Sequence, residues 1–166
     1  MIKMTIEELF DVGVSFESCV GDGTKGERLR IPKNLSRLHL SEDMVSEIKG
    51  FEKELKFLVS GEIWCPDFQL NVAILSKFCE LNHNFDMSII SMARGKKFLS
   101  PILEIENFKG PTIVILDKNY NILGLFEERP KVVANAPSFD DIKLEYYKGK
   151  YLLDSVNDFL EIMRKA

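Results

Sequence analysis

Cys65 is the residue in this sequence with the clearest potential for chemistry. It follows a short apolar run, residues 55–59, and precedes a long apolar segment, residues 67–82, which predicts a buried helix. Pro66 suits the first helical position, where its missing N–H costs nothing. The sulfur of Cys65 is therefore expected at a helix N-terminus, where free N–H groups and the helix dipole could stabilise a thiolate. The alternative is a buried, inert cysteine.

The residues around Cys65 resemble the active site of a known family. Residues 64–68, Trp-Cys-Pro-Asp-Phe, are similar to the W-C-x-x-C motif of thioredoxin-like proteins, and residues 62–67 follow the E-I-W-C-P-D-C pattern of a bacterial group. Gly110-Pro111-Thr112 stands where the family opens its third core strand with a cis-proline, and Glu128-Arg129-Pro130 also resembles the group. The resemblance covers about residues 40–165. It implies an α/β, thioredoxin-like fold in which Pro111 lies against Cys65.

The sequence departs from this family at the positions that matter most for redox chemistry. Phe68 replaces the second cysteine of the motif, which in dithiol enzymes attacks the mixed disulfide and releases the product. Val59 stands where thioredoxins proper often carry a buried acid used in proton transfer. Glu62 and Asp67 add negative charge, which raises the pKa of a nearby thiol. We therefore expect Cys65 to be only modestly activated.

The other two cysteines are weak candidates for the missing resolving thiol. Cys79 lies 14 residues beyond Cys65 on the predicted helix, roughly 20 Å away at 1.5 Å per residue and beyond disulfide reach. Cys79 is better interpreted as a core residue. Cys19 belongs to the N-terminal part and could fold over the site.

The resemblance implies a thioredoxin-like protein with a single active-site thiol, Cys65, which would exchange with protein disulfides or low-molecular-weight thiols. Release of the product would need an external thiol. The substrate would contact residues around the sulfur, namely Trp64, Pro66, Asp67, Phe68, Gly110 and Pro111. Gly110 is itself a departure, since the group usually has a larger residue there. The alternative function is a redox-inactive, thioredoxin-fold binding module, which the apolar ring of Phe68 favours.

The sequence predicts neither a metal site nor a bound cofactor. His39 and His83 have no ligand-like spacing to a cysteine or carboxylate. Residues 21–26 match the G-x-G-x-x-G dinucleotide fingerprint, but no strand precedes them, and Pro32 limits any helix that follows. A loop is the better interpretation of this segment.

The periodicity of apolar residues predicts the order strand, helix, strand, connection, hairpin, helix. The first two strands with their crossover helix should be parallel. Residues 130–150 are expected to be mostly connection. The predicted strands are residues 55–59, 85–90, 111–116 and 122–126, and the predicted helices are a short one near residues 2–10, then 41–51, 67–82 and one starting at about 151.

Length and composition limit the number of domains, the class of partner and the cellular compartment that the sequence allows. With 166 residues the chain should form one core domain, residues 41–166, with residues 1–40 packed on it as an N-terminal extension. The net charge of −4 argues against nucleic acid or an anionic membrane as partner. No apolar run is long enough to span a bilayer. Three irregularly spaced cysteines do not form a secreted disulfide framework, which favours a reducing cytoplasm.

Overall fold

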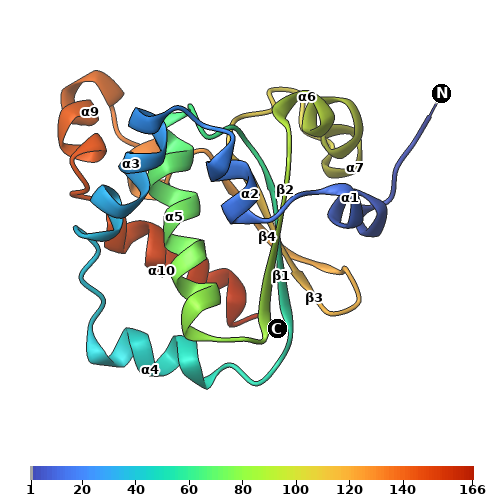
Figure 1. Cartoon of the computed structure of the whole chain (residues 1–166), viewed down its shortest axis with the longest axis horizontal. Helices are drawn as coiled ribbons and strands as arrows, with labels where there is room; N and C mark the ends of the chain where they lie inside the picture. Colours follow the sequence, from blue (N-terminus) through green and yellow to red (C-terminus); the bar gives the residue numbers. More distant parts are fainter. Residues whose placement is uncertain (1) are drawn as a thin grey trace.

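The computed structural model describes residues 2–166, which form a four-stranded sheet with helices on both faces (Figure 1). The spatial order of the strands is β2-β1-β3-β4. β1 and β2 are parallel, whereas β3 is antiparallel to both β1 and β4. The predicted α/β architecture, with one βαβ unit and one hairpin, is therefore confirmed. The strands are β1 (Leu55–Ser60), β2 (Phe85–Ile90), β3 (Thr112–Asp117) and β4 (Ile122–Glu127).

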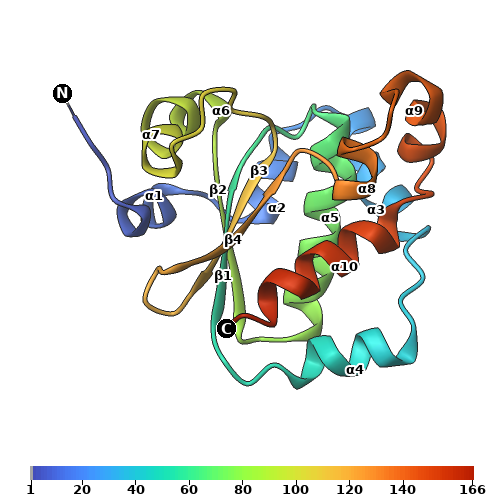
Figure 2. The same cartoon turned by 180° about the vertical axis from the view of Figure 1, so that it is seen from behind.

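One face of the sheet is covered by α5 (Pro66–Leu81) and α10 (Leu152–Met163). Figure 2 shows α10 crossing this face beside α5. α5 is apolar almost all round and most of its residues are buried, because α3 (Lys25–Leu35) and α4 (Glu42–Gly50) pack on its outer side. The strands contribute alternate residues to this core, as period-two side-chain geometry requires; they include Phe57, Val59, Ile113, Ile115 and Phe126.

The opposite face carries a smaller core under four short helical segments. These are α1 (Ile6–Val12), α6 (Met92–Arg94), the π-helical turn η1 (Gly95–Leu99) and α7 (Ser100–Leu103). Leu9 and Leu99 are fully buried against the strand residues that point to this side, which include Leu58, Val114 and Leu116. α1 is the short N-terminal helix that the sequence predicts.

The N-terminal residues pass from one face of the sheet to the other around the edge of β2. Figure 1 shows α1 on one side and α2 (Phe16–Gly21) with α3 on the other. Val14, between α1 and α2, pairs with Ile89 of β2 through two backbone hydrogen bonds of 2.9 and 2.8 Å. Pairing of this kind protects an exposed strand edge from other chains.

The prediction that Pro32 limits a helix is wrong, because α3 continues to Leu35 with Pro32 inside it. The proline costs one hydrogen bond, to the carbonyl of Arg28, which lies on the exposed side of the helix. Two features compensate. Thr24 and Glu27 form a reciprocal capping box, with bonds of 3.2 and 2.8 Å, and buried Asn34 donates a 2.9 Å hydrogen bond to the Gln69 carbonyl of α5.

The expectation that residues 130–150 are mostly connection is also wrong. The segment contains α8 (Lys131–Ala134) and α9 (Phe139–Tyr147). Asp140 and Asp141 lie in the first turn of α9, where negative charge favours a helix. Among the residues of α9 only Tyr146 is buried, so the helix has no apolar stripe that would mark it in the sequence.

Replacing Leu9 with alanine tests whether the N-terminal helix is part of the folded domain. Leu9 is fully buried, so Leu9→Ala should lower the free energy of unfolding in urea by about 2–5 kcal/mol. The matched control is Val12→Ala on the same helix, where the side chain is 46% exposed, with an expected change within about 0.5 kcal/mol. Equal stability of the two variants would show that α1 is not coupled to the core.

Candidate functional site

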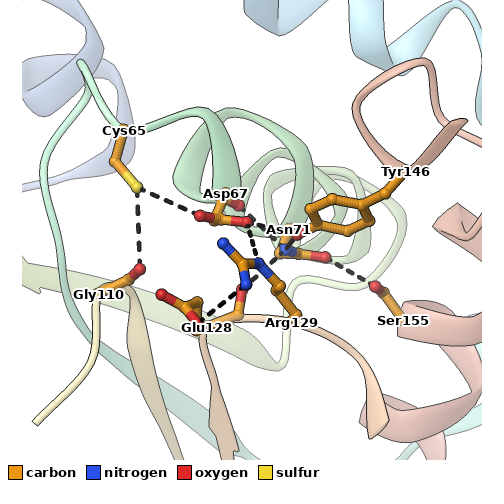
Figure 3. A network of polar contacts seen from close by, with 8 residues as sticks. All are labelled: Cys65, Asp67, Asn71, Gly110, Glu128, Arg129, Tyr146 and Ser155. Atoms are coloured by element: carbon orange, nitrogen blue, oxygen red, sulfur yellow. Dashed lines mark hydrogen bonds and ion pairs between the residues drawn. The ribbon is translucent and has the colours of Figure 1, made fainter. Parts of the chain in front are cut away.

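Cys65 lies between the end of β1 and the first turn of α5, with Pro66 as the first helical residue (Figure 3). Its sulfur is half-buried, and the backbone N–H groups of Asp67 and Phe68 face it. The sulfur lies 3.8 Å from the carbonyl oxygen of Gly110 and 3.9 Å from Oδ2 of Asp67. The thiol proton can therefore be donated to a carbonyl or to a carboxylate.

Gly110 and Pro111 face Cys65 from the loop that opens β3. The peptide bond between them is cis, and Pro111 is buried. A Cβ atom on residue 110 would come within 2.8 Å of the Met92 sulfur. A larger residue before this proline would therefore require the Met92 side chain to move. Nothing in the sequence pattern marks Met92 as a neighbour of the site.

Trp64 and Pro66 form the exposed rim beside the sulfur. Trp64 is 61% exposed, which is unusual for a tryptophan. A groove of about 540 Å³ opens next to these two residues, and its walls also include Arg30 of α3 and Tyr147 of α9. The groove is lined by Trp64 and Pro66, the two neighbours of Cys65, but not by Cys65 itself. It therefore lies beside the sulfur and does not contain it.

Asp67 is the most buried charged residue next to Cys65, with 4% of its surface exposed. Its Oδ1 atom accepts two hydrogen bonds, 3.0 Å from Arg129 Nε and 2.8 Å from the Tyr146 hydroxyl. Its Oδ2 atom points toward Cys65 (Figure 3). The carboxylate is thus held by a cation and a hydroxyl on one side and faces a thiol on the other.

A wider network holds Asp67 and its partners in place. The side-chain amide of Asn71 donates to the Asp67 carbonyl and the Tyr146 hydroxyl, both at 3.0 Å, and its oxygen accepts a 2.7 Å bond from Ser155 of α10. The guanidinium carbon of Arg129 also lies over the ring of Phe139, 3.6 Å from its centre. The network therefore joins α5, the segment after β4, α9 and α10. Besides Asp67 itself, the sequence pointed only to Arg129 among these residues, through the Glu128-Arg129-Pro130 motif.

Comparison with known proteins supports one family. The model of a thioredoxin family matches residues 13–143. The chain belongs to this family. The match includes α2 and α3, so the thioredoxin family model extends over most of the N-terminal helices. No curated protein matches the chain.

Two solved structures are similar to the chain over nearly its full length, both with 32% sequence identity and a TM-score of 0.90. One is a protein of unknown function from Pseudomonas aeruginosa, with 97% of this chain and 98% of that chain covered. The other is an HIV epitope-scaffold, with 98% of this chain and 99% of that chain covered. The thioredoxin fold is therefore shown, while the neighbours leave its chemistry open.

Phe68 lies three residues after Cys65, in the first turn of α5. Its side chain is fully buried, and its ring stacks on Phe16 of α2 with the centres 6.4 Å apart and the planes nearly parallel. The three cysteines are all free. Burial, with Glu62 and Asp22 nearby, raises the pKa of Cys19 to about 11, and burial raises that of Cys79 to about 12. Neither has the character of a ready nucleophile.

The electrostatic surroundings of Cys65 disfavour the thiolate. Burial raises its pKa most strongly, and the charges of Asp67 and Glu128 raise it further. The N–H groups of Phe68 and Asp67 act in the opposite direction, but the net shift is upward. Val59 of β1 is fully buried in the apolar core.

Two further properties concern the whole described chain. Within residues 2–166, no group of three or more His, Cys, Asp or Glu side chains is arranged to hold a metal ion. None of the helices in this range combines the length and the apolar character that crossing a bilayer requires.

The raised pKa of Cys65 predicts a distinctive alkylation profile. Because the thiolate is the reactive form, the rate of alkylation by iodoacetamide should rise with pH and reach half its maximum above the value of about 8.5 that is typical of a free cysteine. The rate is measured for each cysteine separately by mass spectrometry of peptides, with a short cysteine peptide as reference. A rate that is already constant below pH 7 would show that the thiolate is stabilised after all.

Proposed function

We propose that this protein is a single-thiol member of the thioredoxin family that exchanges Cys65 with a disulfide in a polypeptide or in a low-molecular-weight compound. The observation that carries the proposal is the position of the sulfur, partly exposed at the N-terminus of α5 and 3.8 Å from the Gly110 carbonyl. In the reaction, the Cys65 sulfur attacks one sulfur of the disulfide. The old S–S bond breaks, a mixed disulfide forms, and the leaving thiolate takes up a proton.

The mixed disulfide must be resolved by a second molecule. Phe68 carries no thiol and is fully buried, so no group of the motif can attack the Cys65 disulfide. An external thiol completes the cycle by the same exchange chemistry. A reducing cytoplasm, the location that we propose for this protein, supplies such thiols.

The substrate backbone is proposed to lie across the rim formed by Trp64, Pro66, Gly110 and Pro111. Trp64 offers an exposed aromatic surface, and the neighbouring groove has room for side chains of a partner. Asp67 and Phe68 lie beneath this rim and shape it from below, since both are buried.

The alternative function is a thioredoxin-fold module that binds a partner without redox turnover. Two observations favour it: the pKa of the Cys65 thiol is raised chiefly by burial, and Phe68, three residues further on, is a buried ring stacked on Phe16 that carries no thiol. Both functions use the same rim. They differ in whether a covalent bond to Cys65 forms.

Incubation with oxidised glutathione tests the exchange reaction directly. We expect a single glutathione adduct on Cys65, seen as a mass increase of the intact protein, which persists until an external thiol is added. The persistence follows from the missing resolver, because an intramolecular attack would have a large kinetic advantage. Cys65→Ser is the matched control and should gain no adduct. Absence of an adduct on the folded wild-type protein would favour the binding module.

Changing Phe68→Cys rebuilds the complete motif and tests whether the site retains dithiol chemistry. The wild-type protein should be poor at reducing insulin with a dithiol-recycling reductase, whereas the variant should gain activity and form a reversible disulfide with Cys65, since the two residues share the first helical turn. Loss of the buried ring should lower the stability of the reduced variant by about 3 kcal/mol. Insulin reduction and urea unfolding measure the two effects.

A control variant and two contradicting results define this test. The double variant Phe68→Cys with Cys65→Ser is the control and should show no insulin reduction. A folded Phe68→Cys protein that forms no disulfide and has no activity would mean that the groove has lost redox function. Wild-type activity equal to that of a dithiol thioredoxin would contradict the need for an external resolver.

A further inference from the structure

The Oδ2 atom of Asp67 has a single hydrogen-bond partner within residues 2–166, the Cys65 sulfur at 3.9 Å. The other oxygen, Oδ1, is already engaged by Arg129 and Tyr146. Oδ2 therefore faces the thiol with its acceptor capacity free for that contact. A buried carboxylate with one oxygen fixed and the other directed at a thiol has the geometry of a proton-transfer pair.

A proton acceptor is needed at this position because Cys65 is a protonated thiol. Its pKa is raised above the ordinary range, and a thiol must lose its proton before or during attack on a disulfide. Val59 of β1 is an apolar core residue and offers no carboxylate. The Gly110 carbonyl, the other hydrogen-bond acceptor of the thiol, cannot take a proton.

We propose, on the basis of the exchange reaction described above, that Asp67 is the catalytic proton acceptor and donor for Cys65. As the Cys65 sulfur forms a bond to one sulfur of the disulfide, its proton passes to Oδ2 of Asp67. The old S–S bond breaks and its electron pair goes to the leaving sulfur. Asp67 returns the proton to that thiolate, so the products are a mixed disulfide and a free thiol. The carboxylate is regenerated.

The groups around this pair are consistent with that role. Arg129 compensates the charge of Asp67 from the segment after β4, and Tyr146 of α9 donates to the same oxygen. Tyr147 faces the pair from α9, and Glu128 lies near enough to act on the Cys65 thiol by its charge. Glu128 is ion-paired with Arg129 at 3.5 Å and makes no hydrogen bond to the sulfur, which makes it a suitable control.

Two disulfide probes separate proton transfer from simple charge effects. Dithiobis(nitrobenzoate) releases a thiolate that is stable without a proton at neutral pH, whereas bis(2-hydroxyethyl) disulfide releases a basic thiolate that benefits from a proton donor. The second-order rate constants for Cys65 are measured at pH 7 with both probes for the wild type, Asp67→Asn and Glu128→Gln. Cys65→Ser supplies the background. Asparagine keeps an oxygen for Arg129 and Tyr146, so the fold should persist, which circular dichroism checks.

We expect Asp67→Asn to slow the reaction with the hydroxyethyl probe by roughly 100-fold relative to the nitrobenzoate probe, the lower range for a positioned acid–base group. Glu128→Gln should leave this ratio unchanged. If Asp67 acts only through its charge, both variants will instead speed up both reactions, because removing negative charge lowers the thiol pKa. That result overturns the proposal.

Two further results complete the test. If the wild-type protein reacts with neither probe, the exchange function itself is overturned. If the wild type reacts with both probes but the ratio of the two rate constants is the same in Asp67→Asn, only the proton-transfer role of Asp67 is overturned. If Asp67→Asn fails to fold, the solvent deuterium isotope effect on the reaction of wild-type Cys65 with each probe tests the proton transfer instead. An isotope effect larger with the hydroxyethyl probe than with the nitrobenzoate probe supports proton transfer in the rate-limiting step, and equal effects contradict it.

Discussion

Burial of the Asp67 carboxylate at the start of α5 is the constraint on which the rest of the site depends. An unpaired charge in such a place costs several kcal/mol, so the fold must bring compensating groups to it. Arg129 supplies the cation and Tyr146 the hydroxyl, at 3.0 and 2.8 Å from the same oxygen. Meeting this requirement fixes the segment after β4 and the end of α9 against the N-terminus of α5. Those contacts also hold Cys65 in front of Gly110.

The same carboxylate has two opposite effects on the thiol. Its charge disfavours the Cys65 thiolate, yet its free oxygen is placed to receive the proton of that thiol. Phe68, in the same first turn of α5, is fully buried and carries no thiol. Phe16 stacks on Phe68, which makes an N-terminal helix part of the support of the site. A family match that begins at residue 13 is consistent with that arrangement.

The fold was largely predictable from the sequence because its strands are short apolar runs, rich in β-branched residues in β3, and are separated by clear turn or helix signals. The long-range contacts of the site were not predictable in the same way. Asp67 and Tyr146 are 79 residues apart, and α9, which carries Tyr146, has only a weak apolar pattern. The extension of α3 through Pro32 depends on a capping box, whose Thr24-x-x-Glu27 signature is present in the sequence, and on packing against α5. No local sequence pattern indicated that Met92 lies against Gly110.

The account rests on Cys65 being a protonated thiol that donates its hydrogen to Asp67. The S–H stretching band in the infrared difference spectrum between the wild type and Cys65→Ser measures this most directly, since the bands of Cys19 and Cys79 cancel. At neutral pH the account predicts an S–H band for Cys65, at a frequency lowered by hydrogen bonding and shifted upward in Asp67→Asn. A missing band, which would mean a thiolate, or a band that does not respond to Asp67→Asn, would contradict it.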